Sequence, residues 1–320
     1  MSSIISKPIT IMGANASGKT ALAIELAKKT DGEIISADSK QIYKHLAAGT
    51  SKPAGLWKTV LGKEVYLVDG IPYHLVDFLD PLTAYDAGTF AGDAKALMDA
   101  ISAKGKTPIV VGGTGMYIQA LWNGLDPLPE PDLKMRKDLA AFADEQGRAA
   151  LHAELAALDP KAAAQIPPNN IQRVIRALEI TKLSGRPVSE LWTGKFMDAL
   201  PGHLGKFVFL KWEKELLTER IKSRTVAAFD AWVEETRELL ARGCPEDAPG
   251  LKSLGYPQVM DFIAGSLPRA ETIHAIVTVS MSYAKRQNTW FGRYKNAMRM
   301  DFAAPADYDL ETLSERILNP

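Results

Sequence analysis

Gly13-Ala14-Asn15-Ala16-Ser17-Gly18-Lys19-Thr20 is the stretch that decides the fold of this 320-residue chain. It matches the pattern G-x-x-x-x-G-K-[ST] and lies between an apolar run at residues 9–12 and an amphipathic helical pattern at 21–29. In that context the pattern indicates a phosphate-binding loop, whose backbone N–H groups and helix N-terminus attract an anion. We expect all eight residues to bind the diphosphate group of a ligand, which could be a nucleotide or any other diphosphate, with Lys19 neutralising its outer charge and Thr20 holding Mg²⁺ through its hydroxyl.

Short apolar runs alternate with helical patterns on either side of this loop. Strands are predicted at 33–37, 108–111 and 207–210, and a helix at 89–103. This alternation predicts an α/β fold with a P-loop-type parallel sheet. A Pro-rich stretch at 126–131 interrupts it and is followed by helical patterns at 132–145, 147–158 and 170–183.

The predicted domains follow from that interruption. Residues 1–123 form the first part of the catalytic core, and 124–197 form a helical insertion. Residues 198–320 continue the core and end in a helical C-terminal region, with helices expected at 213–224, 227–241 and 270–290.

The composition excludes several classes of protein. Lys plus Arg and Asp plus Glu both number 38, so only local segregation of charge could attract a polyanion. A single cysteine, Cys244, allows no internal disulfide and no cysteine-based zinc cluster. We find neither an apolar run long enough to span a membrane nor a secretion signal, and we therefore expect a cytoplasmic protein.

Polar motifs follow two of the predicted strands. Asp38, Ser39 and Gln41 come after the strand at 33–37, and Thr114 stands in Gly112-Gly113-Thr114-Gly115 after the strand at 108–111. Ligands of open α/β sheets bind at the carboxyl ends of strands. Asp38 therefore suits a proton acceptor or metal ligand, and Thr114 suits a donor to phosphate. The alternatives are a helix-capping cluster at Asp38, which is equally compatible, and an ordinary tight turn at Thr114.

Later motifs extend the pattern. They are 169–179 (Asn-Asn-Ile-Gln-Arg-Val-Ile-Arg-Ala-Leu-Glu), Gly255-Tyr256-Pro257-Gln258, and 284–291 (Ala-Lys-Arg-Gln-Asn-Thr-Trp-Phe). Together with the phosphate loop, the Asp38 run (residues 36–43, Ser-Ala-Asp-Ser-Lys-Gln-Ile-Tyr) and the Gly113-Thr114 turn, they resemble the tRNA dimethylallyltransferases, also called tRNA isopentenyltransferases. The motifs appear in the family's order from residue 13 to about 292. We expect the bacterial type of the family, without the zinc finger of the eukaryotic members.

The resemblance implies a reaction. The family transfers a dimethylallyl group from dimethylallyl diphosphate to the exocyclic amine of the adenine 3′ of the anticodon in tRNA. Asp38 would be the base, and Lys19, Thr114 and Arg224 would stabilise the leaving diphosphate. The match at Arg224 is looser, because Ala228 stands where the family often has Met, and a solvated helix arginine is the alternative.

The resemblance also implies a tRNA-binding set. Two basic segments support it: Lys285, Arg286, Arg293, Lys295 and Arg299, interleaved with Trp290, Phe291 and Tyr294, and a strip of Arg173, Arg176, Lys182 and Arg186. Either segment could instead be a solvated face. The implied contacts are Asp38, Ser39, Lys40, Gln41, Thr114, Arg136, Asn170, Ile171, Gln172, Arg173, Val174, Arg176, Gly255, Tyr256, Lys285, Arg286, Gln287 and Trp290. Asn170 and Met281 depart from the Asp and Arg common in the family.

Three other functions remain to be weighed. An ATP-dependent phosphotransferase would need a second apolar strand ending in a metal-binding Asp, for which Val68-Asp69 is a weak substitute. An RNA-binding protein that senses a nucleotide would not need Asp38. A relative that prenylates free adenosine nucleotides would not need the insertion. We therefore expect tRNA, dimethylallyl diphosphate and Mg²⁺ as ligands, no membrane association, and a monomer.

Overall fold

The computed structural model describes residues 7–60 and 62–319 of the chain. Two compact units are present: Met1–Trp122 together with Ala199–Pro320, and Asn123–Asp198. No helix within the described residues is both long and apolar enough to cross a membrane.

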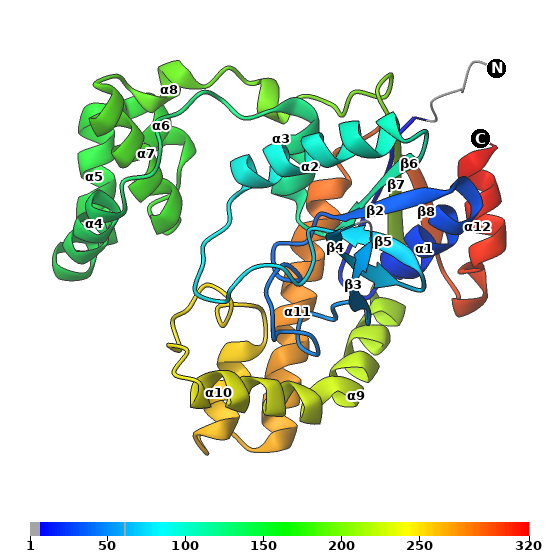
Figure 1. Ribbon diagram of the computed structural model, residues 1–320. Coiled ribbons are helices and arrows are strands. Elements are labelled where there is room, and N and C mark those ends of the chain that lie inside the picture. The colour runs from blue at the N-terminus through cyan, green and yellow to red at the C-terminus, as the bar shows by residue number, and fades with distance from the viewer. Residues whose placement is uncertain (1–6, 61, 320) are drawn as a thin grey trace. The chain divides into compact units, whose positions relative to one another are not determined.

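An eight-stranded, mostly parallel sheet forms the centre of the first unit (Figure 1). Its strand order is β3-β4-β5-β2-β6-β1-β7-β8. The neighbours from β5 to β8 in this order (β5-β2-β6-β1-β7-β8) pair in parallel, whereas β3 with β4 and β4 with β5 pair antiparallel. The strands are β1 (Ile9–Gly13), β2 (Gly32–Ser36), β3 (Leu56–Val60), β4 (Lys63–Val68), β5 (Ile71–His74), β6 (Thr107–Gly112), β7 (Lys206–Trp212) and β8 (Met298–Phe302). Every residue of β1, β2 and β6 is buried, as expected for parallel strands covered on both faces.

Helices surround this sheet within the first unit. They are α1 (Lys19–Thr30), α2 (Ala87–Ala103), α3 (Gly115–Asn123), α9 (Lys214–Ala241), α10 (Tyr256–Ile263), α11 (Arg269–Phe291) and α12 (Leu310–Leu318), with the 3₁₀ turn η2 (Pro305–Asp307). Helices α9, α10 and α11 pack together around Phe229, Trp232 and Ile276, while α12 lies beside α1.

The predicted P-loop-type α/β fold is confirmed, with corrections at the C-terminal side. The two helices expected at 213–224 and 227–241 are one continuous helix, α9, because no Gly or Pro interrupts the chain there. The C-terminal region is also less helical than predicted, since β8 adds a parallel strand beside β7. The antiparallel strands β3, β4 and β5 were not predicted.

The second unit is helical. It contains α4 (Leu133–Gln146), α5 (Arg148–Leu158), α6 (Pro160–Gln165), α7 (Ile171–Ser184), α8 (Val188–Leu191) and the 3₁₀ turn η1 (Lys195–Met197). Leu151, Leu155 and Leu178 lie at the centre of its core. The fully buried carboxylate of Glu179 accepts hydrogen bonds from Arg136, from Arg176 and from the backbone N–H of Asp132. This arrangement ties α4 to α7.

Candidate active site

Three polar motifs meet at one edge of the sheet because their strands are neighbours. Strand β6 lies between β2 and β1, with Ile109 opposite both Ile34 and Ile9. The phosphate loop, the Asp38 run and the Gly113-Thr114 turn leave these strands at their carboxyl ends. The backbone at Ala37 crosses very close to β6, since a Cβ on Gly112 would lie 2.1 Å from the Ala37 carbonyl oxygen. Glycine is therefore required at the end of this strand.

A cavity of about 890 Å³ opens at this edge. Its size falls within the usual range for ligand sites. Residues from the phosphate loop, the Asp38 run, loop 48–51, helix α9 and helix α11 line it; among them are Asn15, Lys19, Thr20, Asp38, Gln41, Thr50, Tyr73, Arg220, Arg224, Trp232, Lys252 and Tyr283. Residues separated by more than 260 positions in the sequence thus share one site.

The phosphate loop has the geometry of an anion cradle. Ala16 and Gly18 adopt positive φ values of 60° and 92°, and helix α1 begins at Lys19 directly behind them. The Lys19 ammonium bonds the Ala14 carbonyl at 2.6 Å. Burial lowers the pKa of Lys19 to about 8, against the opposing effect of the Asp38 charge. An anion bound here would stabilise the protonated form.

Asp38 holds a turn and does not cap a helix. Its Oδ1 accepts hydrogen bonds from the backbone N–H groups of Lys40 (2.9 Å) and Gln41 (3.3 Å), and residues 39–51 form turns, which contradicts the alternative of a helix-capping cluster. The same side chain also lines the cavity. Because Oδ1 is held by the backbone, the carboxylate has a fixed orientation in which Oδ2 can accept a proton.

Thr114 is held beside the Asp38 run. Its Oγ1 accepts a hydrogen bond from the Ser39 N–H at 3.0 Å and donates to Ser39 Oγ at 3.3 Å. Tyr283 on α11 lies nearby, and burial, reinforced by the Asp38 charge, raises the pKa of Tyr283 to about 12. The turn is therefore tied to the Asp38 run through Ser39, and to α11 through Gln287 Nε2, which donates to the Gly113 carbonyl.

Arg224 projects from α9 and lines the same cavity. Burial lowers its pKa, while the nearby charge of Asp38 raises it. These facts contradict the alternative of a solvated helix arginine.

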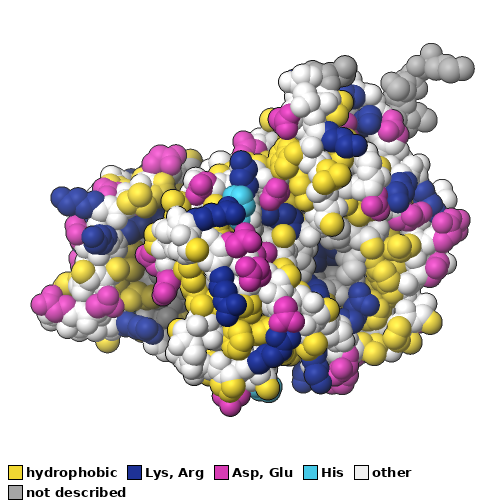
Figure 2. All heavy atoms as spheres, turned by 60° about the horizontal axis from the view of Figure 1, so that its bottom comes forward, with side chains coloured by type: hydrophobic (Ala, Val, Ile, Leu, Met, Phe, Trp, Pro, Cys, Tyr) yellow, Lys and Arg dark blue, Asp and Glu magenta, His cyan; other side chains and the backbone are white. Residues whose placement is uncertain are grey.

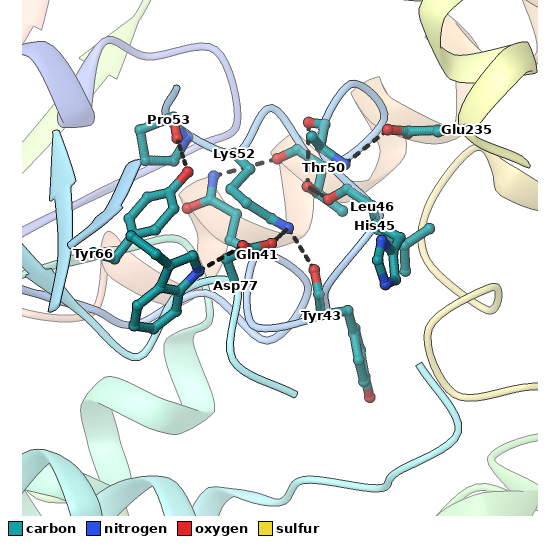
Figure 3. Close-up of polar contacts among 12 residues, drawn as sticks. Gln41, Tyr43, His45, Leu46, Thr50, Lys52, Pro53, Tyr66, Asp77 and Glu235 are labelled. Carbon is teal, nitrogen blue, oxygen red and sulfur yellow. Dashed lines mark hydrogen bonds and ion pairs between the residues drawn. The ribbon is translucent and has the colours of Figure 1, made fainter. Parts of the chain in front are cut away.

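Loop 44–53 forms another part of the wall and is held by buried polar groups (Figure 3). The Gln41 amide donates to the carbonyl oxygens of Thr50 (3.3 Å) and Ser51 (3.0 Å). The Glu235 carboxylate accepts from three consecutive N–H groups, those of Ala47, Ala48 and Gly49, at 2.8–2.9 Å. It also accepts from the Tyr256 hydroxyl at 2.6 Å.

Four residues predicted to bind tRNA serve the fold instead. Tyr256 is fully buried against Glu235, and Val174 is buried in the core of the second unit. Gln287 is buried and bridges the site, because its Oε1 accepts from the Asn15 N–H and its Nε2 donates to the Gly113 carbonyl, both at 2.9 Å. Gly255 likewise packs its Cα against the Trp232 ring, where a Cβ would lie 2.2 Å from a ring carbon.

The aromatic and basic segments also need correction. Phe291 and Tyr294 are buried and therefore present no face for stacking a base. Trp290 packs on Gly115, and its Nε1–H donates to the Tyr294 hydroxyl. The Arg293 guanidinium lies over the Trp290 ring, 4.1 Å from its centroid.

In the second unit much of the predicted basic strip is neutralised within the unit itself. Arg176 and Arg136 bond Glu179, Lys182 pairs with Glu154, and Arg186 pairs with Glu190. Figure 2 shows basic and acidic side chains interspersed over the visible face.

The remaining predicted contacts differ in exposure. Gln172, Arg173, Lys285 and Arg286 are exposed, whereas Asn170 and Ile171 at the start of α7 are partly buried. Ser39 and Lys40 line the cavity, and burial lowers the pKa of Lys40.

A divalent metal has one protein ligand available in the cradle. Thr20 lines the cavity beside Tyr73, and its hydroxyl oxygen has lone pairs that a metal can use. In the described part of the chain no three His, Cys, Asp or Glu residues gather as a metal site. The residues thus suit Mg²⁺, which commonly combines few protein ligands with substrate phosphates and water. Asp69, weighed as a metal ligand, instead lies in the β4–β5 turn at φ 50° and pairs with Lys28.

The sequence pattern missed Tyr73, Arg220, Trp232, Glu235 and Tyr283. Each stands alone in an ordinary helix or strand pattern, so no local signal marks it. Only the packing of α9, α11 and β5 against the phosphate loop brings four of them to the cavity wall and Glu235 behind it.

Comparison with known proteins shows the family of this chain. The family profile described as IPP transferase matches residues 41–294, and the profile described as isopentenyl transferase matches residues 7–70. The tRNA dimethylallyltransferase of Elusimicrobium minutum is 47% identical over 92% of this chain and 94% of that protein. The chain belongs to the tRNA dimethylallyltransferase family.

Solved structures of tRNA dimethylallyltransferases share the fold. The full-length tRNA isopentenylpyrophosphate transferase of Bacillus halodurans is 33% identical, covers 98% of this chain and 96% of its own, and superposes with a TM-score of 0.66. A eukaryotic dimethylallyltransferase captured acting on tRNA is 25% identical, covers 98% and 79%, and has a TM-score of 0.75. The family recognised from the sequence motifs is thereby confirmed, and with it the class of enzyme, a prenyltransferase.

Proposed function

We propose that this protein transfers a dimethylallyl group from dimethylallyl diphosphate to the exocyclic amine of the adenine 3′ of the anticodon in tRNA. The observation that carries the proposal is the presence of Asp38 and the phosphate loop in the wall of one cavity of about 890 Å³. A cradle for diphosphate and a proton acceptor are the two groups that this reaction needs. The tRNA-acting relatives supply the class of acceptor.

The diphosphate of the donor binds the backbone N–H groups of residues 13–20 together with Lys19. The adenine leaves its stack in the anticodon loop and enters the cavity, at a cost of a few kcal/mol that is smaller for a single-stranded loop. The amine nitrogen then forms a bond to the allylic carbon while the bond from that carbon to the diphosphate oxygen breaks. Asp38 accepts the proton that the amine loses.

Charge that develops on the leaving diphosphate is stabilised by donors already in position. Lys19 and Arg224 line the cavity and bring positive charge. Such preorganised donors are effective because they need not reorient during the reaction. The Thr114 hydroxyl, which donates to Ser39 Oγ in the structure, would turn to the diphosphate when the donor binds. Mg²⁺, held by Thr20 and the phosphate oxygens, would add further charge stabilisation.

Exposed residues of the predicted set, Gln172, Arg173, Lys285 and Arg286, bind the tRNA in this proposal, with Ser39, Lys40 and Gln41 contacting the nucleotides that enter the cavity. Arg136 and Arg176 act first as partners of Glu179. We expect the protein to work as a monomer in the cytoplasm, where tRNA is found.

The test compares acceptors under identical conditions. The protein is incubated with dimethylallyl diphosphate, Mg²⁺ and either unmodified tRNA or AMP, and nucleosides are analysed by mass spectrometry. Prenyladenosine from tRNA is expected. Product from AMP alone would favour a free-nucleotide prenyltransferase, and ATP turnover without RNA would favour a phosphotransferase; either result overturns the proposal.

A further inference from the structure

Three consecutive carbonyl groups of the phosphate loop are bound from outside the loop. Arg220 Nε donates to the Ala16 carbonyl at 2.8 Å, Trp212 Nε1 to the Ser17 carbonyl at 3.0 Å, and the Tyr308 hydroxyl to the Gly18 carbonyl at 2.6 Å. These donors come from α9, from the end of β7 and from the segment between η2 and α12. We call them the carbonyl clamp.

The three clamp side chains also stack on one another. The Arg220 guanidinium lies 4.2 Å from the Trp212 ring centroid and 5.7 Å from that of Tyr308. The Trp212 and Tyr308 rings are 5.8 Å apart, and both contact Phe302 of β8. The clamp is therefore one packed group and not three separate surface contacts.

Peptide geometry gives the clamp a consequence for ligand binding. A trans peptide unit is planar, so the C=O of one residue and the N–H of the next point in opposite directions. Holding the carbonyls of Ser17 and Gly18 on the outer side directs the N–H groups of Gly18 and Lys19 to the inner side. Holding the Ala16 carbonyl likewise directs the Ser17 N–H to the inner side, where it makes only a long 3.3 Å contact with the Ala14 carbonyl.

We propose that the carbonyl clamp positions the phosphate loop for its diphosphate. Tyr308 is then a positioning residue of the enzyme, although it lies near the C-terminus and outside the matched family profiles. The proposal rests on the function proposed above. Its structural basis is that Gly18 fits under the Tyr308 ring, where a Cβ would come within 2.5 Å of the ring. Residues 298–318 thus complete the diphosphate site from the far side of the loop.

Tyr308→Phe tests the clamp, because it removes the hydroxyl and keeps the ring packed on Trp212 and Phe302. The affinity for inorganic pyrophosphate with Mg²⁺, measured by calorimetry, is expected to fall about five-fold, on the scale of one hydrogen bond. The KM for dimethylallyl diphosphate should rise by a similar factor, while the KM for tRNA stays within two-fold of the parent value. A general loosening of the fold would not produce this split.

Tyr117→Phe is the matched control, since the Tyr117 hydroxyl also donates to a backbone carbonyl, that of Tyr85, at 3.1 Å, and neither residue lines the cavity. It should leave pyrophosphate affinity unchanged. Unchanged affinity in Tyr308→Phe, or an equal rise of both KM values, would overturn the clamp while leaving the proposed function intact. Absence of prenyl transfer by the parent protein would count against the proposed function, and the pyrophosphate titration would still decide the clamp.

Discussion

Replacing Asp38 with Asn separates the two tasks of this side chain. An Asn side chain has a carbonyl oxygen that can still accept from the backbone N–H groups of Lys40 and Gln41, as Asp38 Oδ1 does at 2.9 and 3.3 Å. The turn that follows β2 should therefore keep its shape. The amide that takes the place of Oδ2 cannot accept a proton from the substrate amine.

The expected loss in Asp38→Asn is that of a positioned general base, about 10²- to 10⁴-fold in kcat. This corresponds to about 3–5 kcal/mol in the activation barrier. The affinity for tRNA should stay within about two-fold, because the backbone geometry is preserved.

Single-turnover prenyl transfer with unmodified tRNA measures the rate, and fluorescence anisotropy measures tRNA binding. The assays should be run near pH 7, since loss of the Asp38 charge further lowers the pKa of Lys19, which is about 8 in the parent. Asp230→Asn is a suitable control, because Asp230 is an exposed residue of α9 that pairs with Arg269. A rate within three-fold of the parent in Asp38→Asn would refute the assignment of Asp38 as the base.

Three further predictions concern charge. The KM for dimethylallyl diphosphate should rise as the pH passes through about 8, because buried Lys19 then loses the proton that attracts the diphosphate; a flat profile between pH 7 and 9.5 would contradict this. Glu235→Gln should lower the free energy of unfolding by about 1–3 kcal/mol in urea titrations, since the charged acceptor of four hydrogen bonds is lost; unchanged stability would exclude its role in holding loop 44–53. Glu179→Gln should destabilise the second unit by about 3 kcal/mol, because Arg136 and Arg176 lose the buried charge that pairs with them, and hydrogen exchange in α4 and α7 should quicken; protection equal to the parent would refute this.

Local patterns predicted the site where a motif is continuous in sequence. The phosphate loop, Asp38 and Thr114 each follow a strand that is buried throughout, and the structure brings all three to one edge of the sheet. Gln287 shows where this reasoning stopped. The sequence placed it in a basic segment facing tRNA, but its amide binds Asn15, 272 positions away, and Gly113, 174 positions away.

Helix α1 and strand β8 show the same difference between what local sequence predicts and what distant pairing decides. Helix α1 was predicted because the loop and the apolar spacing that follows it are local. Strand β8 was not, because its alternating burial extends over only five residues and its partner β7 lies about 90 positions earlier. Short strands of this kind are stabilised by the neighbour with which they pair rather than by their own pattern.

The order of residues alone determined that this chain has a phosphate loop in an α/β sheet, that it carries the motifs of the tRNA dimethylallyltransferases, and that an acid follows the second strand. These features depend on neighbours within a few positions. Only the tertiary structure decided which side chains complete the site: Arg224 rather than a solvated cation, Gln287 as a bridge, and Trp212, Arg220 and Tyr308 as donors to the loop carbonyls. Hydrogen bonds and ring contacts between distant segments exist only once the sheet has brought those segments together, and no local periodicity encodes them.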